Sequence, residues 1–235
     1  ALVARNTRQV FDALGPLRPE AREILVGHVR DSTLGMARWA HRGPRIETEA
    51  DLDDYMHEVA GRVGWLLTEL FALQIPGVEA EKDEMMSLGR EFGLALQTVN
   101  VIRGLHGDWE RGWVFIPQAF VPDGRDPHDL FAPGGRDRET EVAILEHLVP
   151  KAERHLEAAR HYIAHIPRSE KGIRLFCLLP YLFAVRTLAI SRKNPRVFHE
   201  ETKITRPEVR RIAFWTRLLG GSDRWVLWYA RHLAR

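Results

Sequence analysis

Four positions between residues 97 and 108 carry the clearest chemistry in this sequence. The stretch QTVNVIRGLHGD reads as part of an amphipathic helix, on which residues three or four apart share a face. Gln97, Asn100 and Asp108 lie on one such line, and Gly104 stands where that line would take another acid. Amide and carboxylate oxygens are ligands that Mg²⁺ accepts together with water and substrate phosphate. The spacing therefore indicates a metal site, and a polar stripe facing solvent is the alternative it leaves open.

The elements that must position these residues are helices almost everywhere. No strand alternation and no fixed-period repeat is visible, so we predict an all-α, single-domain bundle over residues 1–235. Residues 118–137 are rich in Pro, Gly and Asp and are predicted to form a long surface loop. Apolar residues recur at helical spacing over residues 18–40, 48–73, 81–105, 139–166, 171–192, 205–219 and 222–234.

Composition narrows the class of protein further. A chain of 235 residues with 45% hydrophobic content can bury one large core. The net charge of +2 argues against a broad nucleic-acid surface. The single cysteine, Cys177, lies in an apolar run and has no partner for an intramolecular disulfide, which fits a reducing, cytoplasmic compartment. No uninterrupted apolar run reaches transmembrane length.

The stretch from residue 97 to residue 117 resembles the second aspartate-rich motif of the squalene and phytoene synthase family, the head-to-head prenyl synthases. That motif combines an amide-containing start, an Ile-Arg pair, acids, and then a glycine, an aromatic residue and a proline. The matching residues are Gln97, Asn100, Ile102, Arg103, Asp108, Gly112, Phe115 and Pro117.

Three other stretches resemble the family in the same order along the chain. Residues 55–71, YMHEVAGRVGWLLTELF, are similar to its tyrosine-containing helix with an Ala-Gly-x-Val-Gly kink. Residues 173–189, IRLFCLLPYLFAVRTLA, are similar to the helix that lines its hydrophobic tunnel. Residues 203–209, KITRPEV, are similar to its Lys-Ile-x-Arg segment near the phosphate and reductant end. The resemblance therefore covers nearly the whole chain.

Two departures from the family pattern affect the metal site. Gly104 and Gly107 stand where the second motif usually carries acids, so that Asp108 is its remaining carboxylate. The first aspartate-rich motif of the family has no counterpart in this sequence. We therefore expect the domain to lack an N-terminal segment that carries the first motif.

The resemblance implies an isoprenoid-synthase-like bundle around a central hydrophobic cavity. It implies Mg²⁺-dependent head-to-head condensation of two prenyl diphosphates, above all farnesyl diphosphate, toward squalene or a related C30 product. Squalene-type members also use NADPH, whereas phytoene-type members lose a proton instead. The implied roles are Mg²⁺ binding by Asn100 and Asp108, diphosphate binding by Gln97, Arg103, Lys203 and Arg206, and cation stabilisation or tunnel lining by Tyr55 and Phe176.

Other functions stay open at this point. A catalytically impaired family member would serve as a lipid-binding or assembly protein, and the loss of an acid at Gly104 suits that reading. A class I terpene cyclase would need an acid cluster and an Asn/Ser/Glu triad that we do not find. A helical scaffold would use residues 121–139 as a partner-binding loop, with Lys203 and Arg206 in a solvated turn.

The last thirty residues combine tryptophans with arginines. Trp215, Trp225 and Trp228 alternate with several Arg side chains, a composition typical of helices that lie at a membrane surface. We therefore predict peripheral membrane contact at this end of the chain, with ordinary core packing as the alternative. The oligomeric state is not indicated by the sequence.

Overall fold

The structure is a computed structural model that describes residues 5–43, 45–122, 124–132, 134–135 and 137–235. These residues form helices and no strand. The α-helices are α2 (Thr7–Ala13), α3 (Pro19–Arg42), α4 (Glu49–Met56), α5 (Arg62–Ala72), α6 (Pro76–Ala80), α7 (Lys82–Glu110), α8 (Arg138–His165), α9 (Lys171–Ser191), α10 (Arg206–Leu219) and α11 (Asp223–Leu233). A π-helical segment, η1 (His57–Gly61), joins α4 to α5, and three 3₁₀ turns are η2 (Gln118–Phe120), η3 (Pro127–Phe131) and η4 (Pro195–Phe198).

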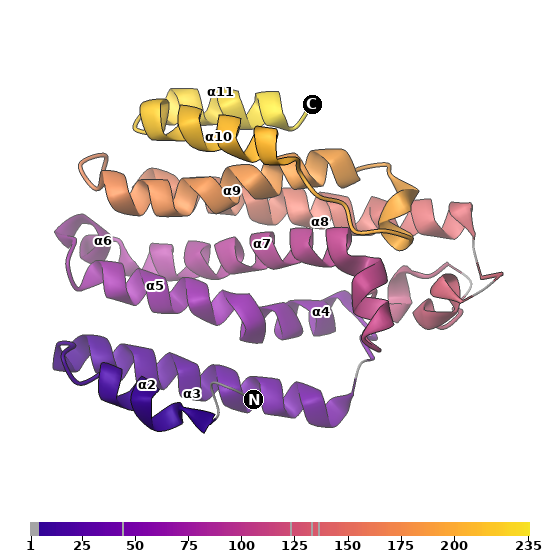
Figure 1. The fold of residues 1–235 in the computed structure, drawn as a ribbon, viewed down its shortest axis with the longest axis horizontal. Coiled ribbons are helices and arrows are strands. Elements are labelled where there is room, and N and C mark those ends of the chain that lie inside the picture. The colour runs from indigo at the N-terminus through magenta and orange to yellow at the C-terminus, as the bar shows by residue number, and fades with distance from the viewer. Residues whose placement is uncertain (1–4, 44, 123, 133, 136) are drawn as a thin grey trace.

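The long helices stack in layers that run along the same direction (Figure 1). Helix α7 is central, because it contacts α5 and η1 on one side and α8 and α9 on the other. Helix α3 covers α5 and η1, and the α10–α11 pair covers α9 at the opposite end of the stack. This layered bundle agrees with the all-α class predicted from the sequence.

Helix α7 runs five residues past its predicted end at residue 105. Leu105 is buried and keeps the last turns packed, and the helix ends where Gly112 takes a left-handed backbone conformation with φ of 83°. Because the helix continues to Glu110, Gly104 and Asp108 both lie on regular helical turns. The line of polar residues therefore exists as the spacing predicts.

Three glycines let η1 and α5 approach the backbone of α7. A Cβ atom on Gly64 would lie 1.8 Å from the carbonyl oxygen of Gly89, and one on Gly93 would lie 2.2 Å from that of Ala60. A Cβ on Gly89 would lie 2.6 Å from Thr68 Oγ1. No side chain fits at these positions, so the glycines set the distance between the two layers.

One segment differs from the sequence-based expectation. The stretch 118–137 is not simply a surface loop, because its two 3₁₀ turns bury Phe120, Pro127 and Leu130 against the bundle. Apolar anchoring outweighs the Pro- and Gly-rich composition there. Helix α8 continues through Pro150, in agreement with the single helix predicted over residues 139–166.

Helix α9 is the helix, among the described residues, whose length and hydropathy would suffice to cross a membrane. Half of its apolar window is buried inside the bundle. A core helix of a bundle shows the same features, and α9 packs against α7, α8, α10 and α11.

Substitution of Gly64 by alanine tests the close helix contact. We expect Gly64→Ala to lower the free energy of unfolding by about 1–3 kcal/mol or more, because the new methyl group meets backbone rather than a movable side chain. Denaturant unfolding measures the effect. The matched control is Gly27→Ala in α3, where a Cβ meets nothing within 4 Å and where we expect stabilisation of about 0.5–1 kcal/mol. Equal effects of the two variants would contradict the proposed contact.

Candidate active site

The polar line of α7 faces a pocket of about 310 Å³. This pocket brings together five of the site residues predicted from the sequence, with neighbours from α7 itself, the segment after α7 and the segment before α10. The chain therefore places the amides, the carboxylate and the tyrosine around one space. The lining residues are Tyr55, Gln97, Asn100, Arg103, Gly104, Gly107, Asp108, Arg111, Phe115 and Glu201.

Asp108 is the carboxylate on the α7 wall of the pocket. Its side chain is 20% exposed and pairs with the guanidinium of Arg111. Burial raises the pKa of Asp108 above its ordinary value, and the negative charge of Glu201 raises it further, while Arg111 and Arg103 act in the opposite direction. The pocket therefore holds an ionised Asp108 less favourably than water does.

Charged groups of both signs lie where α7 meets the segment before α10. Arg103 Nε donates to Asn100 Oδ1 at 3.1 Å, and its NH1 lies 3.5 Å from Glu201 Oε1. Lys203 Nζ lies 2.6 Å from Glu201 Oε2. The segment is tied to α7 because the backbone N–H of Thr202 donates to the Arg103 carbonyl oxygen at 3.3 Å. An incoming anion would find two cations that are already held in place by Glu201.

An aromatic wall lies beside this polar region. The ring of Tyr55 stacks on Phe115 with centroids 4.6 Å apart and lies 6.3 Å from the ring of Trp113. Trp39 of α3 meets Tyr55 edge-on at 5.6 Å. Burial raises the pKa of the Tyr55 hydroxyl, and the charge of Asp108 raises it further. Aromatic faces next to a carboxylate can stabilise a cation that forms nearby.

The position of Tyr55 depends on local sequence in α4. Thr48 and Asp51 form a capping box that begins the helix, and Lys151 of α8 fixes its first turns through Glu49 at 2.9 Å and Asp53 at 2.5 Å. Lys151 is almost completely buried, so its charge has to be paired, and both carboxylates contact it. The π-helical segment follows immediately after this turn, and π segments often occur at functional sites.

The other predicted site residues lie outside the pocket. Phe176 lies on α9 and is 57% exposed, so the described residues do not enclose it in a tunnel. Lys203 reaches the pocket only through its pairing with Glu201. Arg206 begins α10 and is exposed.

Two pocket residues were missed by the sequence reasoning. Glu201 lies in an irregular segment, so helical periodicity does not indicate it, although it comes two residues before the quoted Lys203 segment. Arg111 follows the last helical residue of α7 and pairs with Asp108 three residues earlier. An i, i+3 pairing pattern could have indicated Arg111.

The pocket offers few protein ligands for a metal ion. Across the part of the chain that the structure describes, no three His, Cys, Asp or Glu side chains gather as a metal site. Mg²⁺ commonly uses one or two carboxylates and takes its other oxygens from water and substrate phosphate. Asp108 and Glu201 line one pocket, and the charge of Glu201 raises the pKa of Asp108, a repulsion that a bound cation would relieve. The residues present therefore fit one Mg²⁺ that is held jointly with a phosphate-bearing ligand.

The all-helical bundle, with its polar pocket beside aromatic rings, has the fold of the isoprenoid-synthase class. The solved structure of TcSQS in complex with a ligand matches 94% of this chain with a TM-score of 0.80 and 25% identity, and the match covers 63% of that chain. The squalene/phytoene synthase family model matches residues 2–208. The chain belongs to the squalene/phytoene synthase family, as its motifs predicted.

Curated relatives are about 30% identical to this chain over the aligned residues. Squalene synthase ERG9 of Gibberella zeae is 30% identical over 210 residues, which cover 87% of this chain and 44% of the relative. Botryococcus squalene synthase of Botryococcus braunii is 30% identical over 221 residues, which cover 88% of this chain and 44% of the relative. The chain thus spans less than half the length of these two relatives.

The raised pKa of Asp108 predicts a gain in stability when its charge is removed. A carboxyl whose folded pKa exceeds its unfolded pKa stabilises the folded state at low pH, and this contribution is lost as pH rises through the folded pKa. We expect Asp108→Asn to raise the melting temperature at pH 7, with the difference disappearing below about pH 4.

Thermal unfolding followed by circular dichroism across this pH range provides the measurement. Glu110→Gln is the control, because Glu110 is an exposed acid in the same last turn of α7 and shares its helix-dipole environment. A melting temperature of Asp108→Asn below that of the parent at pH 7 would contradict the assignment.

Proposed function

We propose that this chain forms the diphosphate-binding part of a Mg²⁺-dependent prenyl synthase that joins two prenyl diphosphates head to head. Farnesyl diphosphate is the proposed substrate, and squalene or a related C30 hydrocarbon is the proposed product. The single observation that supports this most is the shared pocket of Gln97, Asn100, Arg103, Asp108 and Tyr55. Family membership points to the same reaction class.

The polar side of the pocket suits a diphosphate group. Arg103 and Arg111 line it and place guanidinium groups near Asp108 and Glu201. Guanidinium groups bind phosphate oxygens in a bidentate manner. In this proposal Arg103 exchanges its contact with Glu201 for the diphosphate, and Gln97 donates its amide N–H to a phosphate oxygen. Lys203 is released toward the same anion when its partner Glu201 turns to the metal.

Mg²⁺, when bound, neutralises charge on the departing diphosphate. Asp108 and Asn100 are the proposed ligands from α7, and Glu201 is a proposed second carboxylate from the opposite wall. A half-buried Asp108 whose pKa is raised gains more from a cation than a fully solvated carboxylate does. The chain thereby links metal binding to substrate binding.

The aromatic side of the pocket suits the carbocation that forms when diphosphate leaves. Tyr55 and Phe115 line the pocket with stacked rings, and Trp113 stacks on Phe115 beside them. The Tyr55 hydroxyl stays protonated because burial and Asp108 raise its pKa. It can therefore donate a hydrogen bond to diphosphate or relay a proton. Phe176 is proposed to line the route of the prenyl chain on α9.

A direct assay tests this function. The full-length protein is incubated with farnesyl diphosphate and Mg²⁺, with and without NADPH, and diphosphate release and hydrocarbon products are measured. We expect Mg²⁺-dependent release that falls by roughly 100-fold in Arg103→Gln, since several kcal/mol of charge stabilisation are lost. Squalene formed only with NADPH would identify a squalene-type reaction. Absence of diphosphate release from every prenyl diphosphate offered would refute the proposal.

A catalytically impaired lipid-binding or assembly protein is the second candidate. The observation that favours it is Gly104, which replaces an acid of the motif and leaves the described pocket with Asp108 and Glu201 as its carboxylates. Under this candidate the bundle would bind prenyl lipids without releasing diphosphate. Binding of farnesyl diphosphate without turnover separates the two candidates.

Restoring an acid at position 104 measures how far the metal site has been retained. A Cβ on Gly104 would lie 3.4 Å from Asp108 Oδ2, an ordinary contact, so an aspartate fits without moving backbone. We expect Gly104→Asp to tighten Mg²⁺ binding in the presence of diphosphate by roughly tenfold, because Mg²⁺ favours a second carboxylate.

Calorimetric titration with Mg²⁺ and inorganic diphosphate measures this affinity. Gly104→Asn is the matched control, with the same shape and no charge. Equal affinities of the Asp and Asn variants would show that the remaining ligands are no longer arranged for a metal.

We also propose a cytoplasmic protein that contacts membranes peripherally. A C30 hydrocarbon partitions into lipid, so a synthase at the membrane surface can release it without exposing it to water. The C-terminal tryptophans singled out in the sequence support this placement, and their arrangement in the structure carries the inference below.

A further inference from the structure

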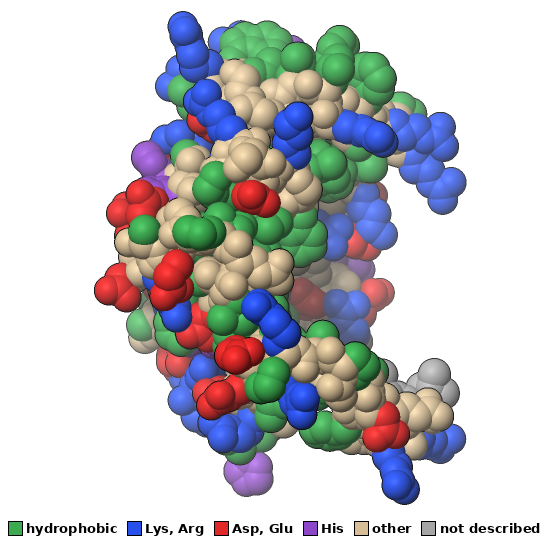
Figure 2. Space-filling view, turned by 90° about the vertical axis from the view of Figure 1, so that its left-hand side faces the viewer, with side chains coloured by type: hydrophobic (Ala, Val, Ile, Leu, Met, Phe, Trp, Pro, Cys, Tyr) green, Lys and Arg blue, Asp and Glu red, His purple; other side chains and the backbone are tan. Residues whose placement is uncertain are grey.

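Helices α10 and α11 form an antiparallel pair at one end of the stack, and their outer face is apolar. The exposed fractions are 62% for Phe214, 64% for Leu218 and 60% for Trp228, with Trp215 at 41%. Figure 2 shows hydrophobic side chains gathered at the top of the molecule, over these two helices, with Lys and Arg side chains beside them. We call this surface the α10–α11 face. Large exposed aromatic and aliphatic groups in one patch mark a contact surface.

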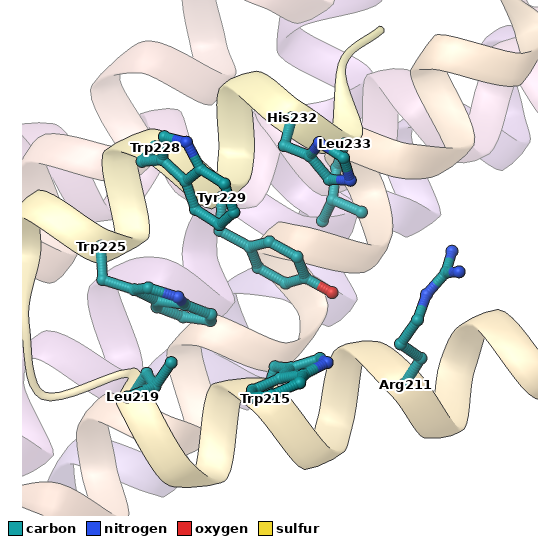
Figure 3. Close-up of a pocket in the computed structure, with 8 residues that line it drawn as sticks. All are labelled: Arg211, Trp215, Leu219, Trp225, Trp228, Tyr229, His232 and Leu233. Carbon is teal, nitrogen blue, oxygen red and sulfur yellow. The ribbon is translucent and has the colours of Figure 1, made fainter.

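A cleft of about 350 Å³ runs between the two helices within this face. Its walls are mostly apolar, and Trp215 and Leu219 of α10 lie across from Trp225 and Trp228 of α11 (Figure 3). Polar groups that interrupt the apolar lining include the hydroxyl of Tyr229, the guanidinium of Arg211 and the imidazole of His232.

The Tyr229 hydroxyl is buried without a partner. Tyr229 is 5% exposed, and its Oη has no hydrogen-bond partner among the described residues. Figure 3 shows this oxygen directed into the cleft, between Trp215 and Arg211. A buried hydroxyl without a hydrogen bond destabilises the folded state. A ligand oxygen in the cleft would accept from the hydroxyl and pair with Arg211.

Arginines flank the apolar strip on both helices. Arg210 and Arg217 are seven residues apart on α10, and Arg224 and Arg231 are seven apart on α11, so each pair lies along one edge of its helix. All four are exposed, and within the described part of the chain none of their guanidinium groups forms an ion pair or hydrogen bond. The apolar strip therefore has free positive charge on each side.

The acids of this region are already neutralised by other helices. Residues 206–235 contain seven arginines and two acids, Glu208 and Asp223. Glu208 pairs with Arg186 of α9 at 2.9 Å, and Asp223 pairs with Arg168 at 2.7 Å and with Arg174 at 2.5 Å. The face consequently presents net positive charge to whatever covers it.

We propose that the α10–α11 face docks on the surface of a bilayer that contains anionic lipid, with one lipid phosphate held by Arg211 and Tyr229. Phe214, Leu218 and Trp228 enter the interfacial region. The flanking arginines reach the surrounding phosphates while their aliphatic stems cover apolar surface. The proposal names the lipid class and the surface for the membrane contact proposed above, and it does not depend on catalysis.

Charge and side-chain type together favour a lipid surface. Tryptophans at the edge of an apolar strip, with basic side chains on both sides, are typical of helices that lie in the plane of a membrane interface. A protein partner would need an acidic rim around an apolar ridge that enters the cleft. A lipid combines an apolar chain that fits the cleft with an anionic head that fits Arg211 and Tyr229.

Vesicle flotation of the substrate-free, full-length protein tests the proposal. We expect binding to vesicles of phosphatidylcholine and phosphatidylglycerol in a 3:1 ratio, and much weaker binding to phosphatidylcholine alone. The Leu218→Ser/Trp228→Ser variant should lower the partition coefficient by roughly tenfold or more, because it removes two interfacial apolar groups. The control is Val29→Ser/Leu34→Ser on α3, whose side chains are 59% and 63% exposed.

Two further variants separate charge from apolar contact. Arg217→Gln/Arg224→Gln should weaken binding to anionic vesicles by roughly fivefold per arginine, with Arg8→Gln/Arg18→Gln as the charge-matched control. Tyr229→Phe keeps the ring and removes only the hydroxyl. It should reduce the preference for anionic over neutral vesicles severalfold, and circular dichroism confirms that each variant is folded.

These experiments test membrane docking by the α10–α11 face independently of the proposed enzymatic function. Equal binding to anionic and neutral vesicles, or no binding to either, overturns it, as does wild-type flotation of Leu218→Ser/Trp228→Ser. A Tyr229→Phe variant with unchanged anionic preference overturns the lipid-phosphate site. Diphosphate release from farnesyl diphosphate in a protein that does not bind vesicles would leave the proposed function in place and remove this inference.

Discussion

The close contact between η1–α5 and α7 is the constraint on which the rest of the structure depends. Backbone meets backbone at Gly64 and Gly89, and again at Gly93, so the two layers lie nearer than side chains would permit. That spacing places Tyr55, which lies two residues before η1, at the same pocket as Asp108. Asp108 lies near the end of α7. Without these glycines the aromatic and polar walls would separate.

In the pocket, the placement of charged groups destabilises the ligand-free protein and favours ligand binding. Asp108 is kept partly away from water beside Glu201, and its raised pKa records the unfavourable interaction. Arg103, Arg111 and Lys203 offset this charge in the free protein. Under the proposed function, a cation and a diphosphate would replace these internal pairings. The α10–α11 face is organised in a related way, because its unpartnered Tyr229 hydroxyl and unpaired arginines are groups that a lipid would satisfy.

Much of the fold could be predicted from the sequence because local patterns determine it. The long helices follow from apolar periodicity, and the line of Gln97, Asn100, Gly104 and Asp108 follows from helical geometry. Glu201 could not be predicted, since it lies in an irregular segment whose path is set by its hydrogen bond to Arg103. The burial of Phe120 and Leu130 in a Pro- and Gly-rich stretch was likewise decided by packing.

By itself the sequence determined which side chains share a helix face, where helices begin at capping residues, and which family the motifs resemble. Only the tertiary structure decided that Tyr55 and Glu201 meet the α7 line, that Phe176 is exposed, and that Tyr229 lacks a partner. The physical reason is the distance along the chain over which each effect acts. Periodicity and capping act over one or two turns, whereas a pocket forms from residues far apart in the chain that close helix packing brings together.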